Sequence, residues 1–200
     1  RKLMYGMVNN PEQKNLGIEK YPPEKGLYLS ILRETKLHTP DKAGTSWHFS
    51  GETLEDVPKE FRPLWKATND LLEGSAGAGS PVGLADIYNV WSLPPFGLKP
   101  GVLPVLALSY LTARKSELAV YVDGLFEYRF DDLLADHILL QPSKFRLKLV
   151  EAKGVRKETL KALVKFTGDL LDNRRGETAL AAAQSLAQFA HKLHPWVKRT

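Results

Sequence analysis

Two β-rich runs separated by an Asp-Gly dipeptide constrain the middle of this chain more than any other local feature. The segment ELAVYVDGLFEYRF covers residues 117–130 and places Asp123 and Gly124 between the two runs. An Asp-Gly pair readily adopts the positive φ angles that a two-residue hairpin turn requires. We therefore predict a β-hairpin whose tip is Asp123-Gly124.

The segments around this hairpin predict one domain over residues 80–150. Residues 101–115, GVLPVLALSYLTARK, are apolar on nearly every helical face, which indicates a buried central helix. DDLLADHILLQP predicts a helix that begins at its paired aspartates, and KFRLKLV (144–150) alternates basic and apolar residues like a half-buried strand. The predicted fold class is α+β, mainly helical, with a winged-helix-like core that contains a β-hairpin and is followed by a C-terminal helical hairpin.

Three further segments complete the predicted domain organisation. Residues 1–21 are rich in Asn, Lys and Gly and predict an extended arm from a preceding domain. Residues 22–79 predict a helical lead-in with a short strand at TSWHFS, and residues 151–200 predict a basic helical hairpin with its turn at NRRGE.

The glycine-rich segment LLEGSAGAGSPVGL resembles a phosphate-binding loop only in its glycine spacing. Such a loop requires a lysine directly after its last glycine and lies between a strand and a helix. Here Ser80 follows Gly79, and the residues before Gly74 have apolar side chains at helical spacing. We expect the glycines to end that helix and to form a flexible connector. ATP binding by this segment is not expected.

The net charge of +5 is concentrated in the last quarter of the chain. Residues 1–150 carry 18 basic and 18 acidic side chains, whereas residues 151–200 carry 10 basic and 5 acidic ones. A localised basic face can hold phosphate groups or an acidic partner, although most such faces are only solvated. The candidate nucleic-acid-binding residues are Arg156, Lys157, Lys161, Lys165, Arg174 and Arg175.

The sequence contains no complete set of residues for catalysis, metal binding or cofactor binding. His191 and His194 form a pair at i, i+3, but no third ligand lies nearby in sequence, and zinc sites need three or four. Asp132, Asp136 and His137 could form an acid–base group, although carboxylates in a first helical turn are ordinary partners of the helix dipole. We therefore predict a segment with no enzymatic activity, metal or cofactor.

Membrane and redox signals are also missing. The longest apolar run, GVLPVLALSYLTA, is shorter than the roughly 20 residues that span a bilayer. The chain contains no cysteine, which excludes disulfides and fits a reducing compartment. We expect a cytoplasmic location, no membrane partner, and an origin as one piece of a longer protein.

The segments LPPFGLKPGVLPVLALSYL, LAVYVDGLFEYRF and LLQPSKFRLKLV together resemble a region downstream of the nucleotide-binding core in very large bacterial ATP-binding proteins. These include the P-loop ATPases of BREX-type phage-defence systems. PPEKGLYLSILRETKLH and WHFS also look like this family's pattern, so the resemblance covers about residues 22–150. It implies an AAA-like NTPase as the parent protein, with this piece outside the phosphate site, and no family catalytic residue maps onto this chain.

These observations predict a non-catalytic nucleic-acid-binding or assembly domain of a larger bacterial ATPase that acts in phage defence. The predicted partners are duplex DNA, whose phosphates the tail helices would contact, and other subunits or domains of the ATPase. The alternative is a protein-interaction scaffold module that makes no contact with nucleic acid.

Overall fold

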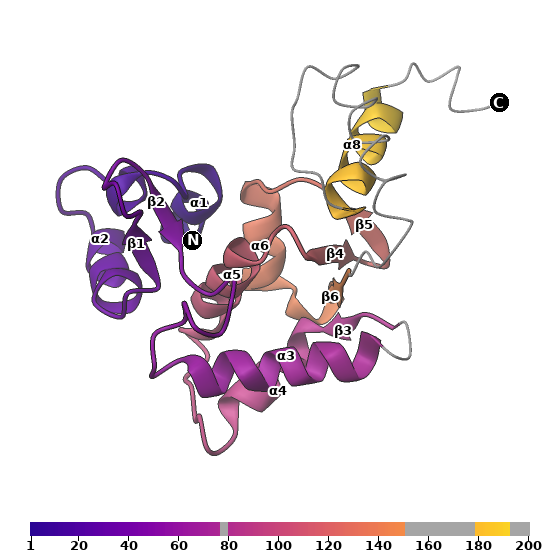
Figure 1. Ribbon diagram of the computed structural model, residues 1–200, viewed down its shortest axis with the longest axis horizontal. Coiled ribbons are helices and arrows are strands. Elements are labelled where there is room, and N and C mark those ends of the chain that lie inside the picture. Colours follow the sequence, from indigo (N-terminus) through magenta and orange to yellow (C-terminus); the bar gives the residue numbers. More distant parts are fainter. Residues whose placement is uncertain (77–79, 151–178, 193–200) are drawn as a thin grey trace.

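The computed structural model describes residues 1–76, 80–150 and 179–192 of the chain. This part is α+β and mainly helical, as the sequence predicts, with two small antiparallel sheets (Figure 1). The α-helices are α1 (Lys2–Asn9), α2 (Pro23–Leu27), α3 (Arg62–Ala76), α4 (Leu84–Ser92), α5 (Leu103–Ala113), α6 (Asp132–Leu140) and α8 (Ala179–Lys192). The 3-10 helices are η1 (Lys14–Gly17) and η3 (Pro142–Lys144), and η2 (Tyr28–Arg33) is a π-helix. The strands are β1 (His38–Pro40), β2 (Trp47–Phe49), β3 (Val82–Gly83), β4 (Leu118–Val122), β5 (Leu125–Glu127) and β6 (Phe145–Leu149).

The N-terminal residues form a packed helix, so the prediction of an extended arm over residues 1–21 is wrong. Helix α1 buries Leu3, Met4, Met7 and Val8 in the hydrophobic core. This spacing places the four side chains on one face of a helix. The polar residues of this segment lie on the opposite face of α1 and in the loop that follows it.

Polar contacts fix α1 against α6. Arg1 Nη2 lies 2.6 Å from Asp136 Oδ2, and the Tyr5 hydroxyl donates to the same carboxylate at 3.0 Å. Asn9 Nδ2 donates to Asp132 Oδ1 at 2.7 Å. Because Arg1 at the N-cap of α1, Tyr5 and Asn9 are four residues apart and the two aspartates are also four apart, the contacts form a row along both helices.

The N-terminal sheet pairs β1 with β2 in antiparallel register, with Thr39 opposite His48. The strand predicted at TSWHFS is confirmed as β2, and the preceding helical prediction is confirmed by α2 and η2. Strand β1 was not predicted, because it has only three residues and ends at Pro40. Its burial comes from packing against η2 and β2 rather than from a local pattern.

Helix α3 continues through Gly74 to Ala76, so the prediction that the glycines end this helix is wrong at Gly74. A Cβ at Gly74 would meet no atom within 4 Å, so its surroundings are open. Glycine inside a helix costs about 1 kcal/mol relative to alanine, which a long helix can absorb. Residues 77–79 of the predicted connector lie outside the described residues, and β3 begins shortly after them.

The larger sheet has the strand order β3-β6-β4-β5, with every pair antiparallel. The predicted hairpin is confirmed, because Val122 pairs directly with Leu125 across the turn. Asp123 and Gly124 have φ angles of 50° and 81°, the left-handed values that such a turn requires. The predicted strand KFRLKLV is confirmed as β6, which lies between β3 and β4.

Helix α5 forms the centre of the core, as its uniformly apolar sequence predicts. Every residue from Leu103 to Thr112 is buried. The helix contacts α1, β2 and α6, so the N-terminal segment covers it on one side. Two of its buried hydroxyls are satisfied within the helix, because Ser109 donates to the Val105 carbonyl at 2.8 Å and Thr112 to the Leu108 carbonyl at 2.7 Å. The Tyr110 hydroxyl donates to Asn69 Oδ1 on α3 at 2.7 Å.

Helix α8 lies beside β4 and β5, over one face of the larger sheet (Figure 1). Residues 151–178, which contain the first helix and the turn of the predicted C-terminal hairpin, lie outside the described residues. Within the described ranges, no helix combines the length and the apolar character needed to cross a membrane.

Candidate nucleic-acid interface

The six basic residues predicted from the sequence all lie outside the residues that the structure describes. They are Arg156, Lys157, Lys161, Lys165, Arg174 and Arg175. Their placement on one helical face and its continuation at the turn therefore stay predictions.

A second candidate surface lies on the larger sheet and is described by the structure. Residues on a strand point alternately to the two faces. Val120, Phe145 and Leu147 belong to the core, so their strand neighbours face the other way. We call this opposite side the outer face. Its strand residues are Gly83, Ala119, Tyr121, Phe126, Arg146 and Lys148.

Tyr121 occupies the middle of the outer face. It is paired with Arg146 on β6 and with Phe126 on β5, so an arginine and a second aromatic ring flank it. The rings of Tyr121 and Phe126 have their centroids 5.9 Å apart at an interplanar angle of 59°. Directly opposed residues in antiparallel strands lie side by side, so these three residues are neighbours on one face of the sheet.

The outer face carries positive charge without a carboxylate among its strand residues. Arg146 is exposed, and Lys148 is half-buried two residues further along β6. Lys144, just before the strand, lies 3.3 Å from Asp123 and is thereby partly neutralised. Asp86 lies beside Gly83, at the sheet edge opposite β5. The aromatic part of the face is therefore cationic.

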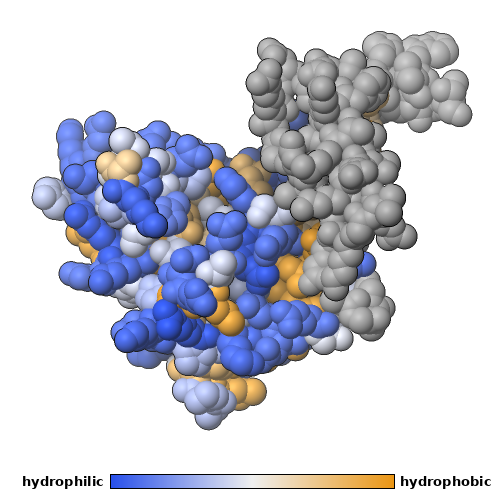
Figure 2. Space-filling view, in the orientation of Figure 1, coloured by the Kyte–Doolittle hydropathy of each residue, from blue (hydrophilic) through white to orange (hydrophobic). Residues whose placement is uncertain are grey.

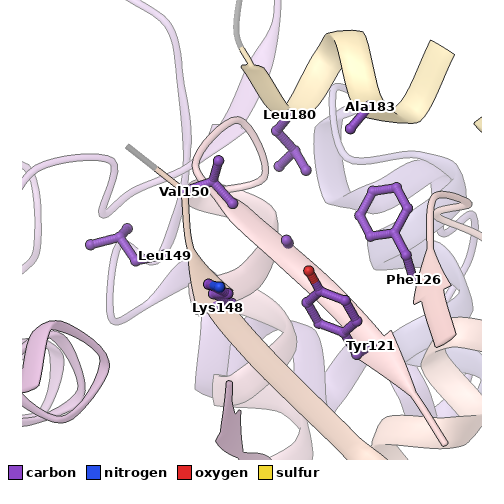
Figure 3. A pocket seen from close by; sticks show the side chains of 8 residues that line it. Tyr121, Phe126, Lys148, Leu149, Val150, Leu180 and Ala183 are labelled. Carbon is purple, nitrogen blue, oxygen red and sulfur yellow. The ribbon is translucent and has the colours of Figure 1, made fainter. Parts of the chain in front are cut away.

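A pocket of about 410 Å³ opens between the outer face and α8. Tyr121, Phe126 and Lys148 form its floor, while Leu180 and Ala183 of α8 border the other side (Figure 3). The Tyr121 hydroxyl points into the space between β4 and α8 (Figure 3). Figure 2 shows hydrophobic atoms gathered over the region of β6, on a described surface that is otherwise mainly hydrophilic. The pocket combines aromatic walls with a few polar groups, as ligand sites usually do.

The acidic residues of α6 have structural roles in the described part of the chain. The Asp131 carboxylate caps the helix by accepting from the backbone nitrogens of Leu133 and Leu134. The hydrogen bond from Arg1 is the largest cause that holds the pKa of Asp136 below its ordinary value; desolvation opposes it, and the Tyr5 hydrogen bond adds to the lowering. Asp131 therefore caps the helix, whereas Asp136 lies beyond the first turn and holds the N-terminal segment against α6.

His191 approaches Tyr128, with ring centroids 6.3 Å apart, and His194 lies outside the described residues. No group of three or more potential metal ligands occurs within residues 1–76, 80–150 and 179–192.

His38 is a buried histidine that the sequence analysis did not single out. Its Nε2 lies 2.8 Å from the Pro11 carbonyl oxygen, and its Nδ1 lies 3.0 Å from the Tyr28 hydroxyl. A carbonyl can only accept, so Nε2 carries the proton and Nδ1 accepts from Tyr28. Burial lowers the pKa of His38 below its ordinary value, which keeps the ring neutral. This arrangement is structural, because both ring nitrogens already have partners.

Sequence reasoning missed the combination of Tyr121, Phe126 and Arg146. The alternation in KFRLKLV places Arg146 and Lys148 on one side of a strand. The hairpin centred on Asp123-Gly124 similarly places Tyr121 opposite Phe126. Only the position of β6 next to β4 brings the two sets together, and that pairing has no local sequence signal.

Comparison with protein-family models, with curated proteins and with solved structures found no match to this chain.

Proposed function

We propose that this chain is a non-catalytic nucleic-acid-binding domain of a larger bacterial ATPase. One observation carries the proposal: the outer face aligns Arg146 with the rings of Tyr121 and Phe126 and has no carboxylate among its strand residues. Aromatic rings stack on bases of any sequence, and cationic side chains attract the phosphate backbone. Such a surface favours binding that depends on salt and only weakly on sequence.

The chain order α3-β3-α4-α5-β4-β6 and the sheet order β3-β6-β4 support the winged-helix-like interpretation. In this interpretation β5 and α6 are an insertion between the last two strands. Helix α5 then occupies the position of the helix that reads the major groove in related folds. Its burial from Leu103 to Thr112 leaves no polar face for base edges, which favours the outer face as the binding surface.

The relation to BREX-type ATPases and the role in phage defence stay predictions from the sequence pattern. The segment 151–200 follows β6 in the chain and carries the excess positive charge. We expect Lys157, Lys161 and Lys165 to add phosphate contacts there.

A role in assembly is the second candidate, and the exposed side of α6 favours it. Leu133 and Leu140 are exposed by 49% and 61%, and their spacing of seven residues places them on one side of the helix. Two exposed leucines on one side of a helix can anchor the packing of another domain. The neighbouring domain or subunit would belong to the same ATPase.

Binding of labelled DNA at several salt concentrations tests the proposed function. The full 200-residue chain should bind at about 50 mM salt, and the logarithm of the binding constant should fall linearly with the logarithm of the salt concentration. If fluorescence anisotropy detects no binding of either single-stranded or duplex DNA at low salt, the nucleic-acid proposal is wrong and the assembly role becomes the better account.

A further inference from the structure

We propose that the pocket between α8 and the outer face holds one unstacked base of a single-stranded nucleic acid, so that the domain prefers single strands to duplex DNA. This inference rests on the proposed function and names the form of nucleic acid that the same surface binds. It differs from the sequence prediction, which assigned duplex contacts to the tail helices.

The dimensions of the pocket suit one base. Its volume of about 410 Å³ falls at the lower end of the range for small-ligand sites. Two alanines create the space: Ala119 on β4 and Ala183 on α8 face the same volume from opposite sides. Larger side chains at these positions would close the gap between the sheet and the helix.

The chemistry of the walls suits a base rather than an aliphatic group. Tyr121 and Phe126 offer two rings inclined at 59°, so a flat ligand can stack on one and meet the edge of the other. Among the described residues, the Tyr121 hydroxyl has no hydrogen-bond partner. It points into the space below α8, where it can donate to or accept from the edge of a base (Figure 3).

The charge beside the pocket suits the phosphate of the same nucleotide. Arg146 is the direct cross-strand neighbour of Tyr121 and is exposed to solvent. A base stacked on Tyr121 would therefore place its phosphate group near the guanidinium, which binds phosphate oxygens in a bidentate manner.

The helix above the pocket explains the preference for single strands. In a duplex, both faces of each base are covered by neighbouring bases, so a base enters a pocket only after it is unpaired and unstacked. That step costs a few kcal/mol in a duplex and much less in a single strand. Because α8 covers one side of the pocket, the intact double helix cannot bring a base to Tyr121.

The test compares an oligothymidine of about 20 nucleotides with a mixed-sequence duplex of equal length, by fluorescence anisotropy on the full chain. We expect the single strand to bind about tenfold more tightly or better. Tyr121→Ala and Phe126→Ala should each weaken single-strand binding roughly 5- to 100-fold, the range measured for stacked bases. Tyr21→Ala is the aromatic control, because this ring is 88% exposed and belongs to the N-terminal loop.

A second variant keeps both rings and fills the pocket. Ala183→Leu adds volume at an exposed position of α8 that borders the pocket, and Ala190→Leu adds the same volume at an exposed position of α8 outside it. Ala183→Leu should remove the preference for single strands, and Ala190→Leu should preserve it. Circular dichroism and unfolding midpoints verify that each variant is folded.

The outcomes separate this inference from the proposed function. If the unmodified chain binds duplex as tightly as single strand and Ala183→Leu changes neither affinity, the pocket inference is overturned while nucleic-acid binding stands. If no nucleic acid binds at low salt, both proposals fail. Loss of single-strand binding in Tyr121→Ala and Ala183→Leu, with duplex binding unchanged, supports the pocket as the site of base recognition.

Discussion

The Tyr28 hydroxyl donates to Nδ1 of His38 across 3.0 Å inside the core of the N-terminal segment. Trp47 and Phe49 lie beside the same imidazole, with ring centroids 5.2 and 4.7 Å away. The neutral ring thus joins η2, the loop at Pro11 and strand β2. Protonation would place a charge among aromatic side chains, and no carboxylate within the described residues pairs with this ring.

We predict that stability falls as this histidine is forced to protonate. The pKa of His38 in the folded state is lowered, chiefly by desolvation, from the ordinary value of 6.5. The unfolded chain therefore binds the proton first, so this contribution is complete above pH 6.5 and is lost as the pH falls from there toward the folded-state pKa. Urea unfolding at a series of pH values from 8 to 5 measures how the free energy of unfolding changes over this range.

Variants isolate this histidine from the other titrating groups. His38→Gln should be less stable at pH 7.5 and should lose part of the pH dependence below 6.5, because Gln does not titrate there. His137→Gln, on α6, is the matched control, because His48 itself acts on the pKa of His38. If a folded His38→Gln variant keeps the same pH dependence of stability, the lowered pKa of His38 is not the cause of that dependence.

Gly51 is predicted to tolerate no side chain. Its φ angle is 119°, and a Cβ would lie 2.5 Å from Nε1 of the buried Trp65. Gly51→Ala should destabilise the fold by about 2 kcal/mol or more, since it combines backbone strain with a steric clash in the core. Gly26→Ala is the control, because Gly26 lies in α2 with no atom within 4 Å of its added Cβ, and alanine favours a helix. Thermal melts followed by tryptophan fluorescence compare the two.

Asp136 should matter more to stability than an ordinary surface carboxylate. It receives hydrogen bonds from both Arg1 and Tyr5 and holds α1 against α6, whereas Asp70 makes one exposed ion pair with Lys66 within α3. Isolated surface ion pairs contribute little. We expect Asp136→Asn to lower the unfolding midpoint and Asp70→Asn to leave it nearly unchanged. Equal midpoints for both variants would argue against α1 as an integral part of the fold.

The basic C-terminal segment gives a prediction that depends on the sequence alone. Replacing Lys157, Lys161 and Lys165 together by Glu should leave the chain folded, because changes at exposed positions usually alter stability by less than about 0.5 kcal/mol. If these residues contact phosphates, the variant should lose affinity for every DNA sequence and show a weaker salt dependence. Unchanged binding by a folded variant would exclude this segment as part of the interface.

The sequence predicted the elements whose conformation depends on neighbouring residues in the chain. The Asp123-Gly124 turn, the uniformly apolar α5 and the alternating β6 each follow from a pattern within about fifteen residues. Helix α1 has only eight residues, and the polar composition of residues 1–21 masks the helical spacing of Leu3, Met4, Met7 and Val8. Strands β1 and β3 were missed because two or three residues carry no periodicity, and their identity depends on pairing with distant strands.

The candidate interface could be predicted only in part. The charge of Arg146 and the aromatic character of Tyr121 are visible in the sequence, but their contact requires β6 to lie beside β4 across 24 intervening residues. Helix α6 and η3 occupy half of that interval. Pairing over such a separation is decided by the packing of the whole core, as is the position of α8 over the pocket.

Salt-dependent binding of single-stranded DNA to the Arg146→Ala variant tests the central claim most directly. Lys99→Ala is its charge-matched control, because Lys99 is exposed in the loop between α4 and α5, away from the sheet. The account predicts that Arg146→Ala weakens binding and reduces the slope of log K against log salt by about one, while Lys99→Ala behaves like the unmodified chain. Identical affinity and slope for all three proteins would show that the outer face does not bind nucleic acid.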